Sequence, residues 1–251
     1  MLAAAFALAG LVMGSVAGCL SYRLPRGIPV ILDRSRCPAC GTVLAARDLI
    51  PVLSWLLHKA RCRHCGGAVS PRYPLVEIVT ALLFVLAFRC AAGDLPIAVI
   101  TSVGAFALVV IALADWETRI IPDAMLLLLL PVVVAWRWSV GGDWADGLAG
   151  ACLAVAVGGG LRWAFRRWRG KDGLGFGDVK FLAVAGLAVG LSGLGGYLVA
   201  CGLAGIVFGA VWRAAGRGAV FPFGPALSAG LLAGLLMPDL FSSGLFAVGS
   251  F

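Results

Sequence analysis

Two aspartates lie at the ends of apolar stretches, where a carboxylate is costly to bury. Asp115 closes the stretch that ends Ala112-Leu-Ala-Asp115, and Asp178 opens another within Gly175-Phe-Gly-Asp-Val-Lys180. Acidic groups at membrane depth are functional candidates because their burial must be compensated. When two carboxylates lie close together, one keeps a proton while the other stays charged. Such a pair can activate water and donate a proton to a leaving amine.

The residues around Asp178 admit two interpretations. Gly175 and Gly177 leave the backbone bare, so that a peptide or a second helix can approach closely. Asp178 could instead be only a helix N-cap, and its ionised form is favoured at a helix start in either case. Asp123 follows Pro122 at the start of another apolar stretch, where we expect a capping role.

Four cysteines form the second candidate site, in a segment that is otherwise polar. Two C-x-x-C turns are separated by 21 residues, and together they supply the thiolates of a tetrahedral zinc site. A glycine follows each turn, where a permissive backbone is needed. The reducing cytosol favours thiolates over disulfides. Two disulfides would require this segment to lie on the opposite side of the membrane from the cytosol. The predicted ligands are Cys37, Cys40, Cys62 and Cys65, with neighbouring arginines lowering the thiol pKa values.

The elements that carry these residues are membrane helices. Hydrophobic residues make up 61% of the 251 and charged residues 13%, about half the usual charged share. A spanning helix needs about 20 mostly apolar residues. The sequence therefore predicts an all-α polytopic membrane protein with about eight transmembrane helices, at roughly 1–21, 75–92, 95–114, 121–138, 144–165, 178–192, 196–213 and 222–247.

The basic residues fix the predicted orientation. If eight helices alternate in direction, all but Arg89 and Arg137 of the 20 Lys and Arg residues fall on one side. The positive-inside rule makes that side cytoplasmic and places both termini outside. The net charge of +8 is then explained by topology and lipid head groups, without nucleic-acid binding. We divide the chain into a first helix (1–21), a cytoplasmic zinc loop (22–74) and a membrane domain (75–251).

Other catalytic arrangements find no support in the sequence. The only histidines, His58 and His64, lie in the zinc loop, so a Ser-His-Asp triad in the membrane is excluded. No G-x-x-x-x-G-K-[ST] phosphate loop occurs. Glu77 lies within the second predicted helix, and its carboxylate needs a partner such as Arg72 or a ligand amine.

Taken together, these motifs resemble the type IV prepilin peptidase family over nearly the whole chain. The run from Ile50-Pro-Val-Leu-Ser-Trp55 through Cys62-Arg-His-Cys65 to Ser70-Pro-Arg-Tyr-Pro-Leu-Val-Glu77 resembles the cytoplasmic loop of that family. Asp115 with Ile121-Pro-Asp123 is similar to its first catalytic region, and Gly175 to Lys180 to its second. Pro222-Phe-Gly-Pro225 resembles the motif that opens its last helix.

The resemblance implies a bifunctional enzyme of the bacterial inner membrane. Its substrates would be prepilins or pseudopilins, whose basic leaders are cleaved after a glycine at the cytoplasmic face by Asp115 and Asp178. The new N-terminus would then be methylated from S-adenosylmethionine, with Glu77 as a candidate contact. Two departures fall in the half associated with methyl transfer: Val16-Ala-Gly18 replaces the usual Phe-Leu-Asn, and Arg47-Asp48 stands where an acidic-Asn pair is common.

Three other functions are compatible with part of the sequence. A presenilin-like protease also uses G-x-G-D, but it would not explain the cysteine loop. A zinc-stabilised scaffold of pilus assembly would use its aspartates only as helix caps. A metal or proton transporter should carry acidic groups near the midplane and often shows inverted repeats, whereas the aspartates here cluster at one face.

Overall fold

The computed structural model describes residues 1–30, 34–170, 173–218 and 220–241, among which the regular elements are helices and no strand occurs. Lys171, one of the basic residues used to orient the chain, lies outside them. Two isolated β-bridges, Arg36 with Val43 and Arg61 with Ala68, occur in the cysteine loop. The α-helices are α1 (Leu2–Arg23), α2 (Leu53–Leu57), α3 (Arg72–Cys90), α4 (Leu95–Thr118), α5 (Asp123–Ser139), α6 (Trp144–Arg169), α7 (Phe176–Ala214) and α8 (Gly224–Leu236). The predicted all-α membrane fold is confirmed.

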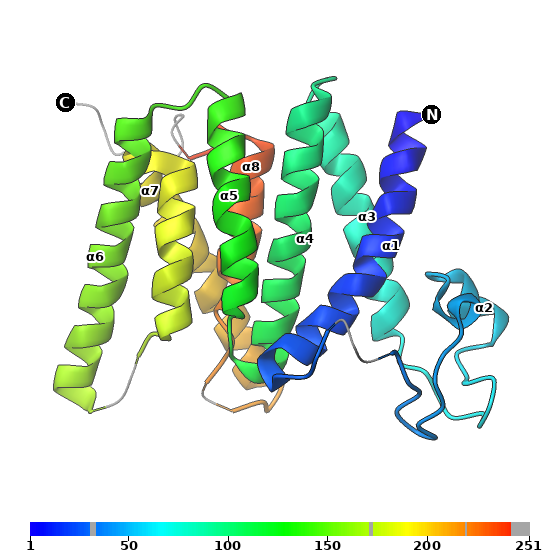
Figure 1. Ribbon diagram of the computed structural model, residues 1–251. Coiled ribbons are helices and arrows are strands. Elements are labelled where there is room, and N and C mark those ends of the chain that lie inside the picture. The colour runs from blue at the N-terminus through cyan, green and yellow to red at the C-terminus, as the bar shows by residue number, and fades with distance from the viewer. Residues whose placement is uncertain (31–33, 171–172, 219, 242–251) are drawn as a thin grey trace.

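The long helices run alternately between two ends of a bundle, as Figure 1 shows. Met1 and the α3–α4 and α5–α6 connections lie at one end, and the cysteine loop with α2 lies at the other. Within the described part of the chain, five helices are long and apolar enough to cross a membrane: α1 with the turn that follows it, α3, α4, α6 and α7. The buried core is formed mainly by α4, α5, α7 and α8, with α4 the most deeply enclosed.

Helix α7 contains two of the predicted spans in one element. Gly190 has a non-helical backbone (φ 73°, ψ 172°), so the helix turns there into two arms, 176–189 and 191–214. Figure 1 shows the arms running in opposite directions. The turn lies slightly before the predicted break at 192–196. Only glycine fits it, since φ is positive and a Cβ at Gly190 would overlap the carboxylate of Asp146.

An ion pair inside the bundle satisfies the backbone groups that this turn frees. The buried guanidinium of Arg137 on α5 donates to the carbonyls of Leu187 (3.1 Å) and Ala188 (3.0 Å) and to Asp146 on α6 (3.2 Å). The other Asp146 oxygen accepts from the backbone N–H of Ser192 at the start of the second arm (3.0 Å). Unpaired groups of this kind are costly in lipid, so Arg137 and Asp146 fix the bend.

Glycines let α1 and α3 pack closely. A Cβ at Gly14 would lie 2.5 Å from the Cα of Glu77, and one at Gly10 would lie 2.5 Å from the Cα of Ala81. The spacing is the small-xxx-small pattern that brings membrane helices together. Glu77 is thereby held against α1, which sets the position of the candidate site in this half of the chain.

Helix α8 is shorter than the predicted span 222–247. It ends at Leu236 and is followed by a turn through Phe241, and residues 242–247 lie outside the described part of the chain. The side chain of Phe241 is buried and packs edge-on against Tyr197, with 5.8 Å between ring centroids. The apolar run therefore predicts the core packing correctly and the helical extent wrongly.

Candidate active site and metal centre

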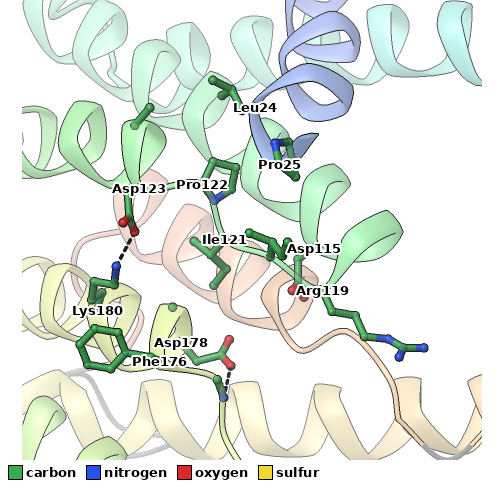
Figure 2. A pocket seen from close by; sticks show the side chains of 14 residues that line it. Leu24, Pro25, Asp115, Arg119, Ile121, Pro122, Asp123, Phe176, Asp178 and Lys180 are labelled. Atoms are coloured by element: carbon green, nitrogen blue, oxygen red, sulfur yellow. Dashed lines mark hydrogen bonds and ion pairs between the residues drawn. The ribbon is translucent and has the colours of Figure 1, made fainter. Parts of the chain in front are cut away.

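The two aspartates face one pocket at the end of the bundle that carries the cysteine loop. The pocket has a volume of about 480 Å³ and is lined by the end of α4, the start of α5, the start of α7 and the short 3₁₀ turn η1 (Leu24–Arg26). Figure 2 shows Asp115 and Asp178 on different walls of it, with Ile121 beside them. We call this cavity the aspartate pocket.

Asp115 is buried, with 5% of its surface exposed, and its carboxylate is held by α8. The backbone N–H of Gly224 donates to its Oδ2 at 2.7 Å. Gly224 is the first residue of α8, so this N–H has no partner within the helix and is free to bind an anion. The site needs glycine here, because a Cβ at this position would lie 2.7–2.8 Å from three Asp115 atoms.

Asp178 lies in the first turn of α7 and is partly buried. Its Oδ2 accepts the backbone N–H of Gly175 at 3.0 Å, which is one half of a capping interaction. The capping role and a position in the pocket are therefore compatible. Gly177 lets the helix start approach the chain before α5, since a Cβ there would lie 3.1 Å from the Cβ of Ile121. The other Asp178 oxygen stays available to the pocket.

The interpretation of Asp123 as a helix cap is wrong. Pro122 is the N-cap of α5, and no side-chain capping bond occurs there. Asp123 instead forms an ion pair with Lys180 at 2.5 Å, drawn as a dashed line in Figure 2. Both residues line the aspartate pocket. Because Lys180 follows Asp178 by two residues, the pair ties the start of α5 to the start of α7.

Glu117 is a residue that sequence reasoning missed. It lies two residues after Asp115 and pairs with Arg72 at the start of α3 and with Arg26 in η1, the latter at 3.7 Å. Arg72 also donates to the hydroxyl of Ser21 at 3.1 Å. These contacts join the N-terminal helices to α4 beside the pocket. Only the scarcity of glutamate in the chain could have drawn attention to it.

Glu77 does not contact Arg72, so that expected partner is wrong. Its buried carboxylate accepts the backbone N–H of Val52 at 2.7 Å, across 25 residues. Val52 has a positive φ of 59° with ψ −49°, a backbone conformation that is unfavourable for a β-branched residue. The contact therefore holds the cysteine loop against α3 at a strained point. Glu77 lies outside the residues that line the aspartate pocket.

The four predicted cysteines come together as expected. Their sulfur atoms all lie within 4.8 Å of one another, and Cys37 Sγ is 3.9 Å from Cys65 Sγ. A tetrahedral Zn–S₄ site with bonds of about 2.3 Å has sulfur separations of about 3.8 Å, so the four donors fit a metal. Gly41 and Gly66 have φ values of 72° and 69°, which confirms the tight turns. His64 is not part of the cluster.

Hydrogen bonds, rather than arginines, lower the pKa values of two of the four thiols. The hydroxyl and backbone N–H of Thr42 lower the pKa of Cys40 to about 6. The backbone N–H groups of Cys65 and His64 lower the pKa of Cys62. The expected arginine effect is absent among the causes of these two shifts. N–H···S bonds of this kind stabilise thiolate and therefore favour metal binding.

Comparison with known protein families identifies the family to which the chain belongs. The model of the bacterial peptidase A24 N-terminal domain matches residues 8–91, and the model of the type IV leader peptidase family matches residues 102–237, more than half of the chain. The chain belongs to the type IV leader peptidase family. The resemblance seen in the motifs is confirmed, and with it the assignment to a peptidase class. No solved structure was found to match.

Curated relatives cover most of the chain. The prepilin leader peptidase/N-methyltransferase of Bacillus subtilis (strain 168) is 35% identical over 92% of this chain and 92% of its own length. The protein of the same name from Aeromonas salmonicida (strain A449) is 36% identical over 79% and 69%. That from Klebsiella pneumoniae is 35% identical over 74% and 85%.

Proposed function

We propose that this leader peptidase removes the basic leader of type IV prepilins or pseudopilins, with Asp115 and Asp178 as its catalytic pair. The observation that supports this most directly is their arrangement. Two carboxylates from different helices face one pocket, and each accepts a backbone N–H from a glycine at the start of a helix: Gly224 for Asp115 and Gly175 for Asp178. Each carboxylate keeps an oxygen for water or substrate.

In this mechanism one carboxylate accepts a proton from water, and the water oxygen attacks the carbonyl carbon of the peptide bond. The other carboxyl group is protonated, and it donates to the departing amine as the C–N bond breaks. The two residues then exchange roles for the next turnover. The protons balance whichever aspartate starts protonated, because the pair holds one proton in total.

The pocket should open toward the cytoplasm. It lies at the same end as the cysteine loop and its arginines, whereas Arg89 and Arg137 end helices at the opposite side. The positive-inside rule makes the basic end cytoplasmic and places Met1 outside. A basic leader would then stay in the cytoplasm while the hydrophobic helix of the prepilin lies in the bilayer, so that the bond between them reaches the depth of Asp115.

Two further proposals concern cofactors. Zinc bound by the four cysteines would hold a loop that is too small for a core of its own, since only a few of its side chains are buried. The names of the relatives include N-methyltransferase. Methyl transfer from S-adenosylmethionine to the new N-terminus is therefore proposed for the half of the chain around Glu77, which α1 and the cysteine loop enclose.

The test uses the purified full-length chain, loaded with zinc, with a full-length prepilin and S-adenosylmethionine. We expect mass spectrometry to show loss of the leader and one added methyl group on the mature product. Asp115→Asn and Asp178→Asn should cleave at least 100-fold more slowly. Asp94→Asn is the matched control, because Asp94 only caps α4 at the other end and asparagine also caps.

Each result of this assay would refute a different part of the proposal. Cleavage without the methyl group would refute the methyl-transfer proposal and leave the peptidase. Normal cleavage by either pocket variant would refute the catalytic pair. If a folded wild type cleaves none of a panel of prepilins, a scaffold role replaces the enzyme.

A further inference from the structure

One face of α5 is exposed along the whole helix, beginning at the aspartate pocket. Its members are Asp123, Leu127, Leu130, Val134 and Trp138, all of which are exposed. At 100° per residue these side chains fall in a band about 80° wide. We call this band the α5 stripe. Asp123 lines the pocket, so the stripe and the pocket are continuous. In Figure 1 α5 lies in front of the core, between α4 and the first arm of α7.

The stripe is hollowed along its second half. A shallow groove of about 630 Å³ is lined by Leu130, Pro131, Val134, Ala135, Trp138 and Ser139. Pro131 lies inside the helix and has no N–H, so the carbonyl one turn earlier lacks its usual partner and the helix surface is uneven there. The residues from 124 to 136 carry no charge. The groove is therefore suited to an apolar segment at membrane depth.

Among the described helices that reach the pocket, α5 is the one whose exposed face runs to a pocket-lining side chain, Asp123, whereas the exposed face of α1, at Leu8, Val12 and Val16, does not include a pocket-lining residue. The first arm of α7 is mostly buried just above Asp178, where Phe181 and Leu182 pack into the core. Most of α4 is buried as well. Helix α1 reaches the pocket through Leu24 of η1, and the residues one and two turns before it, Ser21 and Ala17, are fully buried. The face of α5 is therefore the exposed apolar path that leads directly to a pocket-lining residue.

We propose that the α5 stripe is the docking surface for the hydrophobic helix of the prepilin substrate. This inference rests on the proposed function, because it concerns the same pocket. From Asp123 to Trp138 the stripe spans 16 residues, a rise of about 23 Å along the helix. It therefore accommodates about the first 15 residues after the cleaved bond. Lipid tails are as apolar as the substrate helix, so selectivity at the groove comes from shape and packing.

Photocrosslinking in membranes tests the contact. A photoreactive phenylalanine analogue is placed at Leu130 or Val134, and at Ile206 as a control that is also exposed but lies on the second arm of α7. Full-length prepilin is supplied, and its cleavage is measured in the same membranes. We expect prepilin adducts from the two α5 positions and none from Ile206.

A kinetic test separates docking from damage to the fold. Val134→Trp fills the groove, and Ile206→Trp is its control. For full-length prepilin we expect Val134→Trp to raise KM roughly tenfold, the effect of a steric misfit. For a short peptide that ends six residues after the cleaved bond, KM should be unchanged, because this peptide enters the pocket without reaching the groove.

Several results would overturn the inference while the proposed function stands. They are adducts with lipid or with a second copy of the chain alone, equal prepilin adducts at Ile206, and a KM for full-length prepilin that Val134→Trp leaves unchanged. A similar rise of KM for the short peptide would overturn it too. If wild-type membranes cleave neither substrate, the proposed function has failed and the docking surface falls with it.

Discussion

Replacement of Gly224 by alanine should disable the aspartate pocket, although the substitution adds only one methyl group. The φ of Gly224 is not positive, so alanine fits the backbone. The added Cβ would lie 2.8 Å from both Cβ and Cγ of Asp115 and 2.7 Å from its Oδ2. Carbon atoms pack best at about 3.5 Å or more, so a movement of about 0.7 Å is required.

The magnitude follows from which atoms must move. The Cβ of Asp115 is fixed to α4, so rotation of the carboxylate cannot relieve the contact, and α4 or α8 has to shift. A misplacement near 1 Å costs roughly 100-fold in rate, and we expect kcat to fall by about 10- to 100-fold. Overpacking should also lower the free energy of unfolding by about 1–3 kcal/mol.

Gly175→Ala provides an internal comparison. A Cβ at that position would lie 2.8 Å from Oδ2 of Asp178 but 3.7 Å from its Cγ, so a small rotation of the carboxylate relieves the contact. We expect a smaller loss than for Gly224→Ala. Gly160→Ala is the control, since a Cβ there has no neighbour within 4 Å. The assay is the initial rate of prepilin cleavage at saturating substrate, with thermal unfolding in detergent. A Gly224→Ala protein that cleaves within about twofold of wild type would refute the reasoning.

Three further predictions concern other parts of the molecule. Arg137→Ala should lower the free energy of unfolding by about 3–5 kcal/mol, because it removes the cation that pairs with Asp146 and leaves two carbonyls at the bend of α7 without a donor; an unchanged thermal midpoint would contradict this. Cys62→Ser should remove bound metal and leave the cysteine loop open to limited proteolysis, whereas Cys90→Ser, at the other end of α3, should do neither. Metal content is measured by mass spectrometry and loop exposure by limited proteolysis, and a Cys62→Ser protein that keeps its metal would contradict the prediction. Glu117→Gln should cost only about 1 kcal/mol of stability since its pairs are partly exposed, while releasing Arg72 so that proteolysis reaches the chain after η1 sooner; equal proteolysis would show that Glu117 does not join the two halves.

The sequence predicts those features that depend on local chemistry. The two C-x-x-C turns require the same backbone wherever they occur, so Gly41 and Gly66 adopt positive φ as expected. Apolar length predicts the order of the helices and their alternation between the two ends of the bundle. The alternation also predicts that Asp115 and Asp178 lie at the same end, and the structure places both in one pocket.

Features that depend on distant contacts are missed. The N–H that holds Asp115 comes from Gly224, 109 residues later, and nothing local to either residue indicates it. Asp123 has the sequence of a helix cap and instead pairs with Lys180, because the packing of α5 on α7 brings the two together. Local sequence preferences predict which residue types suit a backbone position such as a helix cap. Tertiary packing determines which partner is nearest.

The central claim is that Asp115 and Asp178 act as one catalytic unit, and a double-mutant comparison of rates tests it most directly. Initial rates of prepilin cleavage are measured for the wild type, Asp115→Asn, Asp178→Asn and the protein with both changes, each shown to be folded by its thermal midpoint. Residues that act as a unit are strongly non-additive. The account predicts that both single variants lose nearly all activity and that the double variant is no slower than either. If either single variant keeps a rate near that of the wild type, or if the two losses multiply in the double variant, the pair is not the catalytic unit.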